Sequence, residues 1–145
     1  MPSGDTPLHI AAAGGYDGVA QLLVKNGANV NAVNKEGWTP LHAASCLYSG
    51  GKRRPGLYAS VVSTLAANRA DLNRIGGPYG QTPLHLAVLS GELEVVQALV
   101  AGGADVNVRS ADHLMITPLQ ETKYCHAKPR CADIARFLKE HGAHE

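Results

Sequence analysis

The stretch Thr82-Pro83-Leu84-His85-Leu86-Ala87 decides the fold of this chain, because copies of it recur along the sequence. The tetrapeptide T-P-L-H also stands at residues 6–9 and 39–42, and a weaker copy, T-P-L-Q, occupies residues 117–120. Successive copies begin 33, 43 and 35 residues apart. A period in this range is typical of proteins built as a stack of like units. One repeated unit therefore accounts for most of the chain.

A second block of sequence closes each unit. The closing segments are Gly27-Ala28-Asn29-Val30-Asn31, Ala70-Asp71-Leu72-Asn73, Gly103-Ala104-Asp105-Val106-Asn107 and the shortened Gly142-Ala143-His144. Together the two blocks predict one domain over residues 1–145, made of four repeats. Their approximate bounds are 4–36, 37–79, 80–114 and 115–145.

The third unit shows most clearly why each repeat folds as it does. Thr82 suits the N-cap of a helix, and Pro83 suits the first helical position, where a missing N–H costs nothing. Gly91 ends this short helix, and apolar residues at helical spacing over 95–100 indicate a second one. Gly103 suits the left-handed position just past that helix. The unit is therefore predicted to be helix, tight turn, helix and projecting loop.

These motifs resemble those of the ankyrin repeat, whose pattern is T-P-L-H-x-A followed by G-A-D-V-N. The resemblance covers the chain from Gly4 to about Ala143. It implies an all-α fold, an ankyrin-repeat solenoid of stacked helix-turn-helix units with projecting β-hairpin-like finger loops. It also implies that the fingers and the first helices form a concave surface that grips another protein.

The second unit departs from the pattern in two places. It carries extra residues between its helices, and the glycines and proline of residues 46–58 favour an inserted loop over a longer helix. Arg69 stands where the other units have Gly27 and Gly103. We therefore expect the left-handed turn to shift to Asn68 or to be strained at Arg69.

The composition and net charge of the chain argue against several classes of protein. The 145 residues carry a formal net charge of +1, which provides no global field for nucleic acid or for an anionic membrane. No window holds the roughly 18 apolar residues that a membrane span needs, and the first residues do not resemble a signal peptide. Three cysteines at irregular spacing do not predict a disulfide framework. We expect a soluble monomer in the cytoplasm, a reducing intracellular setting.

Several histidines and cysteines could take part in catalysis or metal binding, but we favour structural roles for them. The T-P-L-H histidines fall in separate layers of a stack, so hydrogen bonds to backbone or to the motif threonine are expected of His9, His42 and His85. Cys125, His126 and Cys131 lack the C-x2-C spacing of common zinc sites, which favours packed or exposed loop thiols over metal ligands. No catalytic constellation stands out. We therefore predict no enzyme activity, no cofactor and no metal.

The candidates for partner binding are residues that differ from repeat to repeat, at positions between the recurring motif residues. Aromatic residues, Met and Arg are the usual anchors of interfaces, although Trp38 could instead be partly buried against the next finger. In the fingers the candidates are Asn34, Lys35, Glu36, Trp38, Arg74, Ile75, Tyr79, Gln81, Arg109, Asp112, His113, Met115 and Ile116. On the first-helix face and the inserted segment they are Ala13, Cys46, Tyr48 and Leu89.

Three hypotheses of function remain open on the sequence. The first is a non-enzymatic module that binds a partner protein or peptide on the finger and first-helix surface. The second is a regulatory or targeting segment of a larger enzyme, channel or secreted effector. The third is a metal or redox module at the cysteines of the last unit. Fold resemblance alone does not choose among them.

Overall fold

The computed structural model describes residues 4–46, 55–125 and 128–145. Within these ranges the chain forms helices joined by loops, and its one β-type pairing is an isolated antiparallel bridge between Gly76 and Gln81. The helices are α1 (Pro7–Gly14), α2 (Asp17–Lys25), α3 (Pro40–Ser45), α4 (Pro55–Ala67), α5 (Pro83–Ser90), α6 (Leu93–Ala101), α7 (Pro118–Glu121), the 3-10 helix η1 (Thr122–Tyr124) and α8 (Lys128–Glu140).

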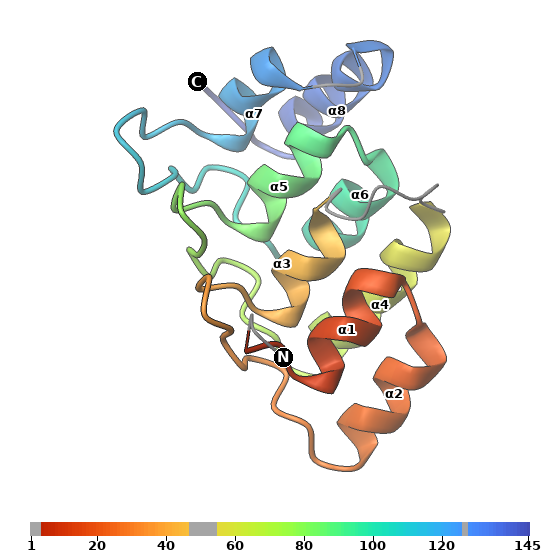
Figure 1. Ribbon diagram of the computed structural model, residues 1–145. Helices are drawn as coiled ribbons and strands as arrows, with labels where there is room; N and C mark the ends of the chain where they lie inside the picture. Colours follow the sequence, from red (N-terminus) through yellow and green to blue (C-terminus); the bar gives the residue numbers. More distant parts are fainter. Residues whose placement is uncertain (1–3, 47–54, 126–127) are drawn as a thin grey trace.

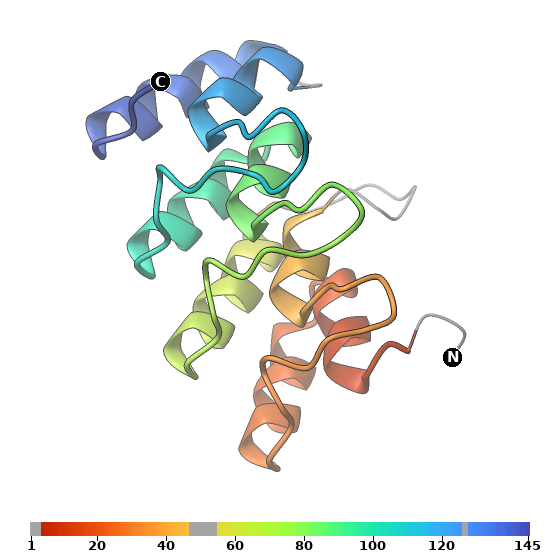
Figure 2. The same ribbon diagram turned by 90° about the vertical axis from the view of Figure 1, so that its left-hand side faces the viewer.

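The helices stack as antiparallel pairs in two rows (Figure 1). The first helices α1, α3, α5 and α7 form one row, and α2, α4, α6 and α8 form the other. The finger loops that join successive pairs all project on one side of the stack, and they face the viewer in Figure 2. The expected all-α solenoid is confirmed.

Each first helix begins in the same way. Thr6, Thr39, Thr82 and Thr117 are the N-cap residues, and in every case the threonine hydroxyl accepts a hydrogen bond from the backbone N–H three residues later. A proline follows each threonine. These caps satisfy amides that the helix itself leaves unpaired. The T-P pair is therefore the local cause of four helix starts.

The motif leucines share one interior. Leu8, Leu41 and Leu84 are 1%, 0% and 1% exposed and belong to the same apolar cluster. The alanines three residues further on are also buried, which lets neighbouring first helices pack closely. The continuous core on which the repeat interpretation depends is confirmed.

The second repeat corrects the expectation of a loop over residues 46–58. Helix α4 begins at Pro55, so residues 55–58 are helical, and the described part of the insertion is a helical extension at the N-terminal end of α4. Tyr58 explains the extension, because its ring is buried and its hydroxyl donates to the carbonyl of Ala13 over 3.1 Å. Tyr48 and the rest of residues 47–54 lie outside the described residues.

The left-handed turn of the second repeat stays at Arg69, with a φ of 68°. Gly27 and Gly103 hold the same place with φ of 89° and 105°. The turn has therefore not shifted to Asn68. A residue with a Cβ in this region is strained by about 1 kcal/mol relative to glycine.

The cysteines of the last repeat correct a second expectation. Cys125 and Cys131 are buried and form a disulfide, with their Cα atoms 6.1 Å apart. The expectation of free loop thiols is wrong for this pair. The packing of η1 against α8 brings the two sulfurs together, which their spacing in the sequence does not reveal.

Candidate partner-binding groove

The histidines of the motif hold each finger against the next repeat. The Nε2 atoms of His9, His42 and His85 lie 2.8, 3.0 and 2.9 Å from the carbonyl oxygens of Trp38, Gln81 and Ile116. In the same rings Nδ1 accepts from the backbone N–H of the motif threonine of its own repeat. Nε2 must then carry the proton and donate it. The expected hydrogen bonds to backbone and threonine are confirmed, and they fix the residue before each following threonine.

Burial favours the neutral form of the His42 and His85 rings. It lowers the pKa of His42 to about 4 and also lowers the pKa of His85. A neutral ring is the form that can accept at Nδ1 while it donates at Nε2. The geometry and the electrostatics therefore assign these histidines to the frame of the fold.

Asparagines hold the other end of each finger. The Oδ1 atoms of Asn31, Asn73 and Asn107 accept from the backbone N–H groups of Asp71, Asp105 and His144 over 2.7, 2.8 and 3.0 Å. Each bond joins one repeat to the next. The fingers are thus tied at both ends, and the side chains between the ties are held on a rigid backbone.

Three hollows lie in a row where the fingers meet the first helices. Their volumes are about 260, 680 and 230 Å³. Glu36 and Trp38 line both the N-terminal and the central hollow, and Tyr79, Gln81 and Leu89 line both the central and the C-terminal hollow. The three hollows therefore form one continuous groove along the stack.

The repeat itself generates the groove, because its lining residues fall in three columns. One column is the residue before each motif threonine. The other two columns lie four and seven residues after the threonine, in the first helix or just past its end. The two helical positions are three apart, so they share one face. The lining members of the columns are Asp5, Trp38, Gln81 and Ile116; then Ala43, Leu86 and Glu121; then Ala13, Cys46, Leu89 and Tyr124.

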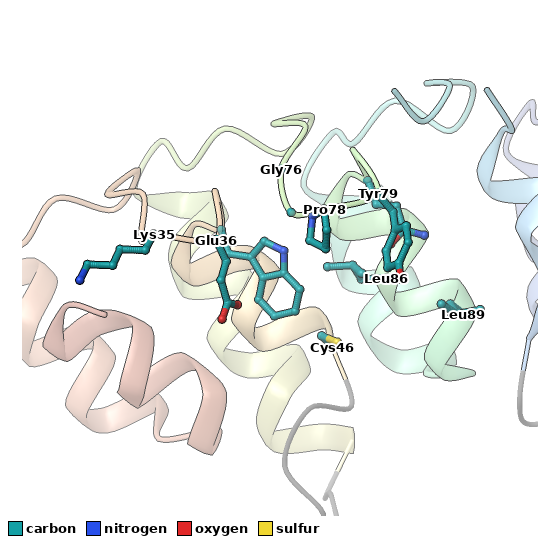
Figure 3. Close-up of a pocket in the computed structure, with 11 residues that line it drawn as sticks. Lys35, Glu36, Cys46, Gly76, Pro78, Tyr79, Leu86 and Leu89 are labelled. Carbon is teal, nitrogen blue, oxygen red and sulfur yellow. The ribbon is translucent and has the colours of Figure 1, made fainter. Parts of the chain in front are cut away.

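The central hollow is the largest and has an apolar floor. Figure 3 shows Pro78 and Tyr79 beside Leu86 and Leu89, with Cys46 on the side of the second repeat. Tyr79 is 65% exposed, whereas Trp38 is half-buried. A Cβ added at Gly77 would collide with the Trp38 indole, so the glycine lets the next finger approach the ring. Trp38 therefore both lines the hollow and packs against the following finger.

The candidates named from the sequence lie in different parts of the finger and first-helix surface. Ala13 and Asn34 line the N-terminal hollow, Asp112 and Ile116 line the C-terminal hollow, and Tyr48 lies outside the described residues. The candidates in the central hollow are Lys35, Glu36, Trp38, Cys46, Tyr79, Gln81 and Leu89. The exposed finger residues that line none of the three hollows are Arg74, Ile75, Arg109, His113 and Met115.

Three of these candidates use their polar groups to shape their own fingers. Asn34 Oδ1 accepts from the backbone N–H of Glu36 and Trp38, and Arg109 donates to the Met115 carbonyl over 2.9 Å. Asp112 Oδ1 accepts from the Ser110 hydroxyl over 2.7 Å, a bond that lowers the pKa of the Asp112 carboxyl. Their first role is therefore structural.

The column four residues after the motif threonine contained no candidate from the sequence, yet its members Ala43, Leu86 and Glu121 line the groove. Tyr124, in the column seven residues after the threonine, also lines the groove without having been a candidate. The signal was present, because Leu86 shares a helix face with the candidate Leu89. Glu121 was hidden by the divergence of the fourth repeat.

The C-terminal hollow contains a buried acid. Glu121 is 4% exposed, and its Oε1 accepts from Gln81 Nε2 over 2.9 Å. Within the described residues its buried Oε2 has no hydrogen-bond partner. Burial, and secondarily the charge of Asp112, raises the pKa of Glu121 to about 7.

The structure gives no support to a metal centre among the described residues. No three side chains of His, Cys, Asp or Glu come together there in a way that could hold a metal ion. Cys125 and Cys131 cannot act as thiolate ligands while they are bonded to each other. His126, the remaining member of the proposed set, lies outside the described residues.

The fold and the groove define a class of protein, a stack of helix pairs that presents a contact surface along its fingers. A family model described as "Ankyrin repeats (3 copies)" matches residues 1–74, and a single "Ankyrin repeat" matches residues 79–111. The chain belongs to the ankyrin repeat family. Ankyrin repeats are protein-interaction modules, and the family is generally non-enzymatic.

Curated relatives are much longer than this chain. It is 33% identical to Rabankyrin-5 of Homo sapiens, in a match that covers 80% of the chain and 12% of that protein. It is 33% identical to a transient receptor potential cation channel subfamily A member 1 homolog of Caenorhabditis elegans, covering 73% and 11%. It is 35% identical to the E3 ubiquitin-protein ligase XBAT33 of Arabidopsis thaliana, covering 67% and 17%. The chain therefore spans less than a fifth of these relatives. Among the described residues, no helix combines the length and the apolar character that crossing a membrane requires.

Proposed function

We propose that this chain is a non-enzymatic binding module that holds a segment of a partner protein along the groove. The continuity of the three hollows carries the proposal, since it provides a path that crosses all four repeats. Trp38 and Tyr79 supply aromatic surface at the centre of this path. Buried aromatic anchors at the centre of an interface usually contribute most of its binding energy.

The character of the groove favours a polypeptide over nucleic acid. Its central floor is apolar, and its rim carries charges of both signs, Lys35 and Glu36. Nucleic-acid sites instead present a stripe of basic side chains that neutralises phosphates. The net charge of +1 fits a protein partner better.

The relatives support a role as one segment of a larger protein. They include a ligase and a channel homolog, and this chain matches only a small part of each. In that setting the groove would recruit or position a partner for the rest of the protein. A monomeric state and an intracellular location stay predictions, and the Cys125–Cys131 disulfide argues against a reducing compartment, where such bonds are rare.

Affinity capture with mass spectrometry tests the proposal. We expect the intact chain to retain one or more proteins that the combined Trp38→Ala and Tyr79→Ala variant loses by at least tenfold, because the variant removes the central aromatic surface. Thermal unfolding of the variant checks that the fold survives.

Tyr16→Ala is the matched control. Tyr16 is 60% exposed, close to the 65% of Tyr79, but it precedes α2 and lines none of the three hollows. Capture should be unchanged in this control. Equal capture by the intact chain and the double variant would exclude the groove as the binding surface.

A further inference from the structure

Glu121 stands out within its column of the groove. The same position is occupied by Ile10, Ala43 and Leu86 in the first three repeats, and the fourth repeat alone places an ionisable group there. Its side chain is 96% shielded from solvent, and one carboxyl oxygen lacks a partner among the described residues. An unpaired buried carboxylate is costly, so its presence needs an explanation.

Among the described residues, the side chains that line the hollow around Glu121 include no compensating positive charge. The C-terminal hollow is lined by Glu121, Asp112, Gln81, two tyrosines and three aliphatic residues, and no lysine or arginine is among them. The nearby Lys123 pairs with Glu145 instead. Two acids and no base therefore meet in one cavity of about 230 Å³.

We propose that the C-terminal hollow receives a lysine or arginine side chain of the partner, whose cationic head binds the carboxylate of Glu121. This inference rests on the proposed function, because it specifies which chemistry the partner presents to one end of the groove. A cation there would supply the hydrogen-bond donor that Oε2 lacks. Charge-assisted bonds of this kind are roughly twice as strong as neutral ones.

The walls of the hollow suit the rest of a basic side chain. Tyr79 and Tyr124 can offer ring faces to a cation, and Leu89 and Ile116 can cover its aliphatic stem. Asp112 adds negative charge beside the same hollow. A bound metal ion fits less well, since the described residues offer no set of three metal-binding side chains.

The side chains of Leu114 and Tyr124 line the hollow and are 49% and 57% exposed. Exposed side chains change rotamer within nanoseconds, so the proposal requires that these two move aside when the cationic head approaches Glu121. The backbone beneath is held by the bond from His85 to Ile116.

Titration with small probes, followed by NMR, tests the inference. N-acetyl-arginine amide and N-acetyl-lysine amide are the cationic probes, and N-acetyl-citrulline amide is the neutral isostere. The readouts are the ring signals of Tyr124 and the carboxyl signal of Glu121. We expect saturable shifts with either cationic probe, affinity at least fivefold above that for citrulline, and a Glu121 pKa that falls by at least one unit on saturation.

Two variants show where the probes bind. Glu121→Gln should weaken binding of the cationic probes at least fivefold, whereas Glu140→Gln, at an exposed acid that ends α8 and lines none of the three hollows, should leave it unchanged. The inference is overturned if citrulline binds as tightly as arginine, if neither cation produces a saturable shift, or if Glu121→Gln has no effect.

Capture of the partner separates this inference from the proposed function. Trp38→Ala alone disturbs the groove but not the C-terminal hollow, which Trp38 does not line. Loss of capture by Trp38→Ala with full capture by Glu121→Gln would uphold the groove and reject the cation site. Normal capture by Trp38→Ala with loss of capture by Glu121→Gln would uphold the cation site and reject the central hollow as the main anchor of the partner.

Discussion

The third and fourth repeats begin alike and then diverge. Both start with Thr-Pro-Leu, and Thr82 and Thr117 cap their helices with the same geometry. The third repeat continues as an eight-residue helix, whereas α7 has four residues and passes into a 3-10 turn. The comparison shows that the first residues of the motif start the helix, whereas the later residues determine its length and how it packs in the stack.

The side chains that differ explain the divergence. Gln120 replaces the histidine and still accepts from the backbone N–H of Thr117, over 2.9 Å. Thr122 replaces the small Ala87, and its hydroxyl donates to the Leu119 carbonyl over 2.6 Å. Such a local bond competes with regular helix, which accounts for the 3-10 turn. Glu121 replaces Leu86, so an acid enters the groove.

The largest change in the free energy of unfolding is expected for the motif leucines, whose variants show whether the third or the fourth repeat contributes more to the core. Leu84→Ala should lower the free energy of unfolding by about 2–5 kcal/mol, because Leu84 is 1% exposed within the shared apolar cluster. Leu119→Ala should cost less, since Leu119 is 5% exposed and lies outside that cluster. Urea unfolding of both variants measures the difference. Equal losses would show that the fourth repeat is as fully integrated as the third.

Glu121→Gln should stabilise the chain at alkaline pH. The folded-state pKa of Glu121 is about 7, above its ordinary 4.5, so the folded chain holds a proton that the unfolded chain releases between these values. The protonated Glu121 side chain therefore contributes to the free energy of unfolding in full below pH 4.5, and this contribution is lost as the pH rises through 7. The variant should gain about 1–3 kcal/mol at pH 8 and much less at pH 4.5. Unfolding curves at the two pH values check this, and a gain that is independent of pH would contradict it.

The histidines should produce the opposite pH dependence. The folded-state pKa of His42 is about 4, below its ordinary 6.5, so its contribution is complete above pH 6.5 and is lost as the pH falls toward 4. In the Glu121→Gln background, lowering the pH from 7.5 to 5 should cost about 2 kcal/mol through this ring. His42→Gln, which copies the fourth repeat, should remove that part of the loss. An unchanged pH dependence in this variant would mean that His42 is not desolvated.

The smallest effect extends the comparison to the second repeat. Arg69→Gly should raise the free energy of unfolding by about 1 kcal/mol, because glycine adopts the left-handed backbone of Arg69 without strain. Arg69→Ala keeps the Cβ and should gain nothing. Thermal or urea unfolding distinguishes the two variants, and equal stability of both would show that the turn carries no strain.

Much of the fold could be predicted because its signals are local or periodic. The threonine caps, the buried motif leucines and the histidine bonds follow from residues a few positions apart and from the repeat period. The helical start of α4 could not be predicted in this way, because it depends on Tyr58 reaching Ala13 in another repeat. The Cys125–Cys131 bond likewise depends on how η1 and α8 meet.

The groove was predicted in part for the same reason. Trp38, Gln81 and Leu89 could be found because they occupy columns that vary within a constant frame. Glu121 could not, because the weak fourth motif conceals its alignment with Leu86. Its raised pKa arises from burial, which only the packed structure reveals.

The asparagine bonds between repeats have a consequence for how such chains change in length. Asn31, Asn73 and Asn107 each use the same atom to reach the backbone of the following repeat. Because the donor and acceptor match at every step, a complete unit can be duplicated or excised without leaving an orphaned polar group at the new junction. The extra residues of the second repeat fall in the sequence between α3 and α4 and not within a finger, and the asparagine bonds on both sides of this repeat are kept. Genetic gain or loss of whole modules is therefore compatible with the fold.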